Sequence, residues 1–183
     1  VSHNYHYNSL NLLEDESMTI TGEKTLALDY AYDALGSLSS ITYPDGDVVG
    51  FAPNGFGAPT VAERQARTGR STQIYASDAQ YYPSGSIDSF KYGNGLTHKT
   101  ILNNRNLPQS IKDSKSGLTA LSYNYTYDDN INVKSITDNI NSAYSLTNLS
   151  YDGLDRLKTT TGGTSIGSSS ISYDGLGNIT KYN

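Results

Sequence analysis

The stretch Tyr30–Ile41, which reads YAYDALGSLSSI, carries the pattern that organises this chain. The pattern returns as YTYDDNINVKSI at Tyr125–Ile136, as LSYDGLDRL at Leu149–Leu157 and as ISYDGLGNI at Ile171–Ile179. A repeat at a period of about 20–50 residues indicates an array of small similar units rather than a single globule. Such arrays bind, enclose or space other molecules more often than they catalyse reactions.

Each unit of the pattern predicts a β-hairpin. Residues 28–32 alternate between large side chains and small or polar ones, which is the period of a strand with one buried face. The segment Asp33–Gly36 predicts a tight turn, because an aspartate at the first position accepts a hydrogen bond from the backbone two residues later. Leu38 and Ile41 begin the return strand, and Tyr43–Gly46 predicts a second turn that leads to the next hairpin.

The fold class that follows is all-β, an array of antiparallel hairpins in which about eight units, some of them degenerate, fill residues 1–183 as a single repeat segment. The tyrosine position of the unit is assigned to residues 7, 32, 53, 81, 101, 127, 151 and 173, and their uneven spacing fits hairpins with arms of unequal length. Val61–Arg67 is the one helix candidate, and a strand that turns at Thr68–Gly69 is favoured there. Gly162–Ser170 is expected to form a hairpin tip, and both chain ends are interpreted as lying within a longer polypeptide.

The repeat positions are expected to have a structural role, the tyrosines in strand ladders and the Asp, Asn and Gly residues in turns. These positions are Tyr32, Asp33, Gly36, Asp45, Gly46, Tyr81, Gly85, Asn94, Gly95, Tyr127, Asp128, Tyr151, Asp152, Tyr173, Asp174 and Gly177.

The amino-acid composition limits the partners that the chain can bind and the chemistry that it can perform. Sixteen Tyr stand beside three Phe and no Trp, and only 36% of the residues are hydrophobic, which favours a thin sheet over a thick core. Disorder is the rival interpretation of the low hydrophobicity, and the regular alternation argues against it. The net charge of −5 without a basic patch argues against a nucleic-acid partner. The absence of Cys excludes disulfides and thiolate chemistry.

These residues resemble the tyrosine-aspartate (YD) repeats of the Rhs family. Tyr-Asp-x-x-Gly-x-Leu-x-x-Ile, as at Tyr32–Ile41, is the hallmark of that family, and Tyr151–Leu157 is equally typical. Tyr82–Gly85 followed by Tyr92–Gly95 is similar to the spacing in bacterial Rhs toxins. The resemblance covers essentially the whole chain.

The resemblance implies a long, curved and spiralling sheet that forms part of a hollow shell around a C-terminal toxin domain. Related shells occur in insecticidal toxin complexes and in teneurins. The partners it implies are the rest of the shell and the enclosed toxin, and it implies a secreted or cell-surface location. The chain has neither a self-cleaving core segment nor a toxin domain, so no enzymatic activity and no cofactor are expected. The alternative is a carbohydrate- or surface-binding module that uses exposed tyrosines.

Two patterns imitate catalytic or metal sites. Gly163–Gly167 matches the nucleophile elbow G-x-S-x-G, which needs a helix after it, but a strand is expected there and a turn is the better interpretation. His3 and His6 could approach each other near the N-terminus, but no acidic residue has a matching spacing for a metal site. His98 falls in an expected strand, where a solvated or packed histidine is the simpler interpretation.

Three further groups are interpreted structurally. Asp128–Asn132 resembles the start of a calcium loop, but Val133 and Asn139 stand where an EF-hand needs Gly and Glu, and a weakly bound cation is the alternative. The repeated aspartates are turn residues rather than paired catalytic acids. Arg64, Arg67 and Arg70, the one local basic cluster, are interpreted as a solvated strand or loop. Unpaired strands at the ends of the array predict edge-to-edge self-association.

Overall fold

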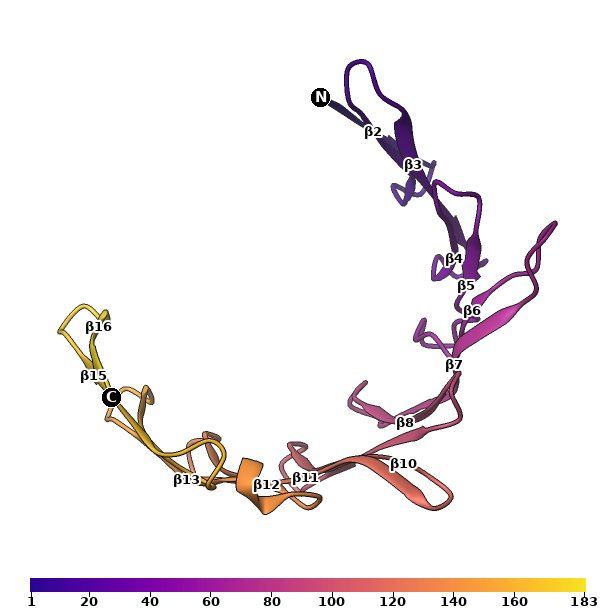
Figure 1. Ribbon diagram of the computed structural model, residues 1–183. Coiled ribbons are helices and arrows are strands. Elements are labelled where there is room, and N and C mark those ends of the chain that lie inside the picture. Colours follow the sequence, from indigo (N-terminus) through magenta and orange to yellow (C-terminus); the bar gives the residue numbers. More distant parts are fainter. The chain divides into compact units, whose positions relative to one another are not determined.

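The computed structural model describes all 183 residues, and its regular structure is almost entirely β-strand (Figure 1). The chain forms two compact units, Val1–Leu96 and Thr97–Asn183. The first unit contains β1 (Ser2–Tyr7), β2 (Leu13–Thr19), β3 (Thr25–Tyr32), β4 (Leu38–Thr42), β5 (Val48–Gly50), β6 (Ala62–Arg64), β7 (Gln73–Tyr81) and β8 (Ile87–Tyr92). The second contains β9 (Thr97–Leu102), β10 (Pro108–Lys115), β11 (Leu118–Tyr127), β12 (Val133–Asp138), the 3₁₀ turn η1 (Ser142–Tyr144), β13 (Leu146–Tyr151), β14 (Leu157–Gly162), β15 (Ser169–Tyr173) and β16 (Ile179–Tyr182).

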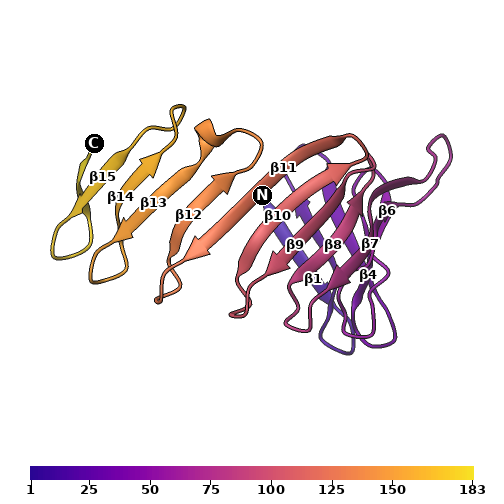
Figure 2. The ribbon, with the colours of Figure 1, turned by 90° about the horizontal axis from the view of Figure 1, so that it is seen from below.

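Within each unit, every strand pairs antiparallel with the strand that follows it in the sequence. Figure 2 shows β12 to β15 of the second unit side by side in chain order, with their connecting turns along two opposite edges. The prediction of an all-β array of antiparallel hairpins is confirmed.

The local predictions agree with the structure except at one position. Val61–Arg67 contains the strand β6 (Ala62–Arg64) and no helix, and the backbones of Arg67 and Arg70 bond each other across the tip at Thr68–Gly69. The segment between β14 and β15 is a hairpin tip, as expected. The assignment of the tyrosine position to residue 101 is wrong by one residue. Leu102 occupies that position, because Asn103 begins the turn through its backbone bond to Leu107.

A β-bulge marks the closed end of the hairpins. The register between β3 and β4 shifts between Ala31 and Tyr32, so that Tyr32 lies opposite Leu38. Comparable shifts stand next to the tyrosine position in six other hairpins. An extra residue at a bulge increases the local twist of the strands, so these seven hairpins are twisted at the same place.

The register gives the sheet two chemically different faces. In the first unit Ile41 lies between Tyr30 and Val49, whereas the next position, Ser40, lies between Ala31 and Gly50. The second unit repeats this contrast, because Tyr125 lies opposite Ile136 while the neighbouring pair is Asn124 and Thr137. One face therefore carries Tyr, Leu and Ile, and the other carries mostly Ser, Thr, Asn and small residues.

No second layer covers either face of the units. No hydrophobic side chain is buried, and the buried residues are Thr100 and Ser145, which are 8% and 2% exposed. The hairpins therefore depend on ladder hydrogen bonds, turn geometry and cross-strand side-chain pairs, each pair contributing about 0.2–1 kcal/mol. The turns and the contacts between hairpins are therefore the candidate functional features of the chain.

Candidate functional site

Eight turns close the eight hairpins, and we call them the Tyr-Asp turns. They begin at Asn8, Asp33, Asn54, Tyr82, Asn103, Asp128, Asp152 and Asp174. In each of them the amide of the first residue donates to the carbonyl four residues later, and the amide three residues later donates back to the first residue's carbonyl.

In the seven Tyr-Asp turns that begin with Asp or Asn, the side chain of the first residue completes the turn. Asp33 Oδ1 accepts hydrogen bonds from the backbone N–H groups of Leu35 and Ser37 at 2.8 and 2.9 Å. Asp152 and Asp174 accept from the equivalent two amides, and Asp128 from the amide of Asn132. Asn8, Asn54 and Asn103 use their side-chain oxygens in the same way. The carboxylate oxygens of the repeat therefore bind backbone amides.

The fourth residue of every Tyr-Asp turn has a positive φ. These residues are Asn11, Gly36, Gly57, Gly85, Asn106, Ile131, Asp155 and Gly177. Gly adopts this left-handed region without a steric cost, and Asn and Asp tolerate it. Ile131, with φ 74°, is the exception, because a β-branched side chain is strained there.

The tyrosine before the turn connects one hairpin to the previous one. Its hydroxyl donates to a backbone carbonyl of the second arm of the preceding hairpin, usually that of the residue opposite the preceding tyrosine position. The Tyr127 hydroxyl, for example, donates to the carbonyl of Pro108 at 2.8 Å. The equivalent pairs are Tyr32 with Leu13 at 2.7 Å, Tyr81 with Pro59 at 2.5 Å, Tyr151 with Val133 at 2.8 Å and Tyr173 with Leu157 at 2.8 Å.

The sequence alone did not reveal these inter-hairpin hydrogen bonds. Each acceptor is a backbone carbonyl, and its residue type varies among Leu, Pro and Val. Pro53 and Leu102 occupy the tyrosine position in two hairpins and have no hydroxyl to donate. The distance of 16 to 22 residues between donor and acceptor is the one signal in the sequence that could have indicated the contact.

Neighbouring Tyr-Asp turns of the second unit also contact one another. Arg105 Nη1 donates to the carbonyl of Asp128 at 3.0 Å, and Asn132 Nδ2 donates to Asp155 Oδ1 at 2.8 Å. A loosely bound cation at Asp128 was the alternative considered for this loop. The structure contains no group of three or more His, Cys, Asp or Glu side chains that could hold a metal ion.

Arg156 links the turn at Asp152 to the last hairpin. Its Nε donates to Asp152 Oδ2 at 2.8 Å, and its guanidinium lies 4.4 Å from the centre of the Tyr173 ring. Hydrogen bonds from the side chain and backbone of Arg156 lower the pKa of Asp152 to about 2. The pKa of Asp174 is also lowered, first by the side-chain amide of Asn178.

The other turns, which lead from one hairpin to the next, are called return turns here, and they contain the remaining predicted positions. Asp45 Oδ1 accepts from the amide of Asp47 at 3.0 Å, and Gly46 has φ 82°. Asn94 Oδ1 accepts from the amide of Leu96 at 3.1 Å, and Gly95 has φ 84°. These two turns repeat the backbone pattern of the Tyr-Asp turns, because the amides of Tyr43 and Tyr92 donate to the carbonyls of Asp47 and Leu96. They differ from most Tyr-Asp turns in that a tyrosine begins them and the third residue supplies the side-chain acceptor.

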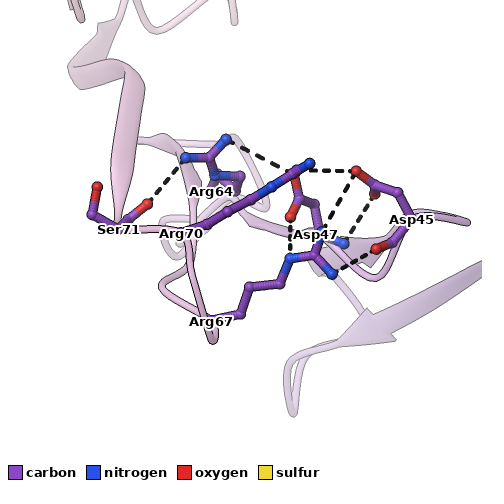
Figure 3. A network of polar contacts seen from close by, with 6 residues as sticks. All are labelled: Asp45, Asp47, Arg64, Arg67, Arg70 and Ser71. Carbon is purple, nitrogen blue, oxygen red and sulfur yellow. Dashed lines mark hydrogen bonds and ion pairs between the residues drawn. The ribbon is translucent and has the colours of Figure 1, made fainter.

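The basic cluster is part of an ion-pair network between two return turns (Figure 3). Arg67 Nε lies 2.7 Å from Asp47 Oδ1, and Arg70 contacts the carboxylates of both Asp47 and Asp45. Arg64 Nη2 donates to the carbonyl of Ser71 at 3.1 Å. The side chains of Arg64 and Asp47 are 17% and 13% exposed. The interpretation of this cluster as solvated is therefore wrong for Arg64. The arginine side chains form ion pairs with the carboxylates of Asp45 and Asp47 instead of extending into solvent.

Charge pairing in the network shifts two pKa values. The pKa of Asp45 is lowered, first by the backbone amide of Asp47 and then by Arg70. The pKa of Arg70 is raised, chiefly by the charge of Asp47. The arginines are thus engaged by carboxylates of the same chain.

His98 is packed rather than solvated and takes part in a cross-strand contact. Its Nδ1 lies 2.7 Å from Asp113 Oδ1 on the neighbouring strand, and its Nε2 lies 3.0 Å from Thr100 Oγ1. An acid, an imidazole and a hydroxyl in this order resemble a nucleophilic triad. However, Thr100 is 8% exposed, so a substrate would have to reach a nearly buried oxygen. We interpret the contact as a link between β9 and β10.

The remaining catalytic and metal candidates are not brought together. Gly163–Gly167 is a turn followed by β15, so the helix that the nucleophile elbow requires is absent. Gly163 is packed against η1, because a Cβ atom there would lie 2.5 Å from the carbonyl oxygen of Ser142. His6 contacts Asp15, with Nδ1 3.1 Å from Oδ2.

A shallow recess of about 490 Å³ lies on the tyrosine face of β1 to β3, next to the return turn at Tyr43 and Pro44. Its lining includes Tyr5, Tyr43, Leu26 and Glu16. Next to it, the Tyr30 hydroxyl donates to Glu16 Oε1 at 2.7 Å, and this hydrogen bond is the main cause that raises the pKa of Tyr30 to about 12. The recess combines aromatic rings with a carboxylate, which suits the carbohydrate alternative. A second concavity of about 810 Å³ is lined by Phe56, Tyr81 and Tyr82.

Together these features define a class of protein: an unlayered, all-β hairpin array held by aspartate-capped turns and inter-hairpin tyrosine hydrogen bonds. Solved structures share this fold. The chain matches the crystal structure of TcdB2-TccC3-Cdc42 with a TM-score of 0.81 and 16% identity, over 96% of this chain and 11% of that one. It matches TcdB2-TccC3 without its hypervariable C-terminal region equally well. The Photorhabdus luminescens Tc holotoxin pore matches with a TM-score of 0.76 and 16% identity, over 92% of this chain and 10% of that one.

These matches confirm, at the level of the fold, the resemblance to YD-repeat proteins of toxin complexes. The chain spans about a tenth of the length of the chains it matches. No family model and no curated protein matches the sequence. No helix of the structure has the length and apolarity needed to cross a membrane.

Proposed function

We propose that this chain is a wall segment of a YD-repeat shell that encloses and shields the C-terminal toxin domain of a secreted Rhs-type protein. Its work in this proposal is mechanical, and none of its residues is catalytic. The observation that carries the proposal is the likeness to Tc toxin structures over 96% of the chain. The single layer of hairpins supports it, because a sheet without a core of its own suits a thin wall.

Limited proteolysis of the full-length polypeptide that carries this segment tests the proposal. The C-terminal domain should resist protease in the wild type. It should become cleavable at a lower temperature when Gly163→Ala weakens the wall at η1, while Gly153→Ala, where a Cβ atom meets nothing within 4 Å, should leave protection unchanged. A C-terminal domain that is cleaved equally in all three proteins would contradict shielding.

An activity assay tests the mechanical role separately. The protein and its Ser165→Ala variant should both lack esterase and peptidase activity. An activity that is present in the wild type and lost on this substitution would replace the shell proposal with a hydrolase.

Carbohydrate binding is the second candidate, and the recess on β1 to β3 favours it. Its volume of about 490 Å³ lies within the range of about 300–1,000 Å³ that is usual for ligand sites. Calorimetric titration with a panel of oligosaccharides tests it. Micromolar binding that is lost in Tyr5→Ala and Tyr43→Ala, but kept in the exposed control Tyr144→Ala, would support a sugar site, and no heat change with any sugar would remove it.

A further inference from the structure

The tip that joins β6 to β7 contains three arginines at intervals of three residues. Its sequence from Arg64 to Ser71 reads RQARTGRS. The tip projects beyond the two strands (Figure 1), and residues 65–72 are all exposed. Exposed tips with small and polar residues are preferred sites of proteolytic cleavage. A protease whose specificity pocket contains a carboxylate selects a basic residue immediately before the bond that it cuts.

Few backbone hydrogen bonds hold this tip closed. The amides of Arg67 and Arg70 each donate to the other's carbonyl at 2.9 Å. The ladder between β6 and β7 begins only at Arg64 and Gln73, and the amide of Ser71 donates to no backbone carbonyl. Segments with so few backbone bonds open locally at a fraction of the free energy of global unfolding. Opening the tip therefore frees the bond between Arg70 and Ser71 while β6 and β7 stay paired.

The ion pairs of Figure 3 restrain the same arginines that such a protease must bind. Arg70 Nη1 contacts Asp47 and lies 3.1 Å from Asp45 Oδ2. Arg67 Nη1 donates to the carbonyl of Asp45 at 2.6 Å. Both aspartates belong to the preceding return turn, so these contacts fasten the tip to a neighbouring part of the same unit. An arginine bound to these carboxylates is not available to the carboxylate of a protease pocket.

We propose that this tip is a masked cleavage site for an endoprotease with an acidic specificity pocket, which cuts after Arg70 when the tip opens. The cut consumes one water molecule. The bond between the carbonyl carbon of Arg70 and the nitrogen of Ser71 breaks, which leaves a carboxylate on Arg70 and an ammonium group on Ser71. The inference goes beyond the proposed shell function, because it needs no enclosed cargo.

The exposure of the three side chains selects the bond. The Arg70 side chain is 44% exposed, against 36% for Arg67 and 17% for Arg64. The bond after Arg64 is also held in the sheet, since the amide of Gln65 donates to the carbonyl of Val48. A cut after Arg70 leaves β6 paired with β5 and β7 paired with β8, so the two pieces stay associated.

Limited proteolysis of the full-length polypeptide tests the site, with trypsin as the probe and mass spectrometry to identify each new N-terminus. The earliest cut within this segment should give a fragment that begins at Ser71, and this fragment should be absent from Arg70→Gln. Lys24 and Lys115 stand at other return turns and serve as internal references. Earlier cuts at these two lysines would overturn the assignment.

The variant Asp45→Asn/Asp47→Asn tests the mask. The rate of cleavage in a locally opening segment follows the population of the open form. An ion pair near the surface changes such an equilibrium by up to about fivefold, so we expect the Ser71 fragment to form about five- to twentyfold faster. The control Asp78→Asn, which removes the ion pair to Lys91, should leave this rate unchanged.

Two results would overturn the mask. An unchanged rate in the double variant would show that the aspartates do not restrain the tip. An equal rise in cleavage at every Lys and Arg would show that the protein opens as a whole, and not at this tip.

Discussion

The Tyr-Asp turns and the return turns join the same strands, but the first kind is uniform and the second is not. The eight Tyr-Asp turns share one backbone hydrogen-bond pattern and one positive φ. Two return turns, Tyr43–Asp47 and Tyr92–Leu96, repeat this backbone pattern and its positive φ, whereas others range from the tight tip at Arg67–Arg70 to the longer connection that contains η1. One edge of the hairpins is therefore uniform, and the other is variable.

The difference separates the contacts that recur along the chain from the contacts that occur once. A standard turn repeats one twist and one tyrosine contact, so it sets the way each hairpin meets the previous one. The return turns hold contacts that occur once, such as the network around Asp47 and the packing of Gly163 on η1. Substitutions in the return turns should accordingly have large and individual effects, and substitutions in the Tyr-Asp turns smaller and comparable ones.

The largest expected effect lies in a return turn. Gly163→Ala would place a Cβ atom 2.5 Å from the carbonyl oxygen of Ser142 and 2.6 Å from that of Ala143. The backbone of η1 must move to relieve this overlap, and we expect a loss of about 1–3 kcal/mol in the free energy of unfolding. Urea denaturation measures it, with Gly153→Ala as the control. Equal midpoints for the two variants would show that η1 is not a fixed contact.

A smaller loss is expected when an inter-hairpin hydrogen bond is removed. Tyr151→Phe deletes the donor to the Val133 carbonyl and should cost about 0.5–1.5 kcal/mol. Tyr127→Phe and Tyr173→Phe should cost similar amounts, because they occupy equivalent positions. Thermal unfolding compares them with Tyr144→Phe, a tyrosine outside this pattern. Losses that differ widely among the three would break the view that this edge is standardised.

One Tyr-Asp turn departs from the standard and should be improvable. Ile131 is held at φ 74° and is 56% exposed, so Ile131→Gly relieves strain while removing little packing. The relieved strain of about 1–2 kcal/mol exceeds the entropic cost of about 0.5–1 kcal/mol that Gly adds, so we expect a net gain in stability of up to about 1 kcal/mol. Leu154→Gly provides the control, because Leu154 lies in the next Tyr-Asp turn, is exposed and does not itself have a positive φ. The idea fails if both substitutions destabilise the protein equally.

The smallest expected effect is the loss of folding stability at low pH through Asp152. The folded state lowers the pKa of Asp152 to about 2, so its stabilising contribution is present above its ordinary pKa of 3.8 and is lost as the pH falls toward 2. The Asp152 side chain is 24% exposed at the surface of the turn, and screening by solvent and salt keeps the contribution small. Melting temperatures between pH 5 and pH 2 should fall less steeply in Asp152→Asn than in the wild type. Identical slopes would mean that Arg156 does not hold this carboxylate.

The repeat was readable from the sequence because its elements are local. The alternation around Tyr30 gives a strand, and the Asp and Gly spacing of Asp33–Gly36 gives a turn, without knowledge of any distant residue. Contacts between hairpins depend on register, which a bulge shifts by one residue. This is why residue 101 was assigned in place of Leu102, and why the partners of Tyr127 and Arg64 were not found.

The central claim is that the repeated aspartate organises the turn rather than chemistry, and amide hydrogen exchange tests it directly. The backbone N–H groups of Leu154 and Arg156 donate to Asp152 Oδ1 in a turn where Leu154 is 73% exposed. Both amides should be protected in the wild type and should exchange like a free loop in Asp152→Ala. Rapid exchange of both amides already in the wild type would contradict the account.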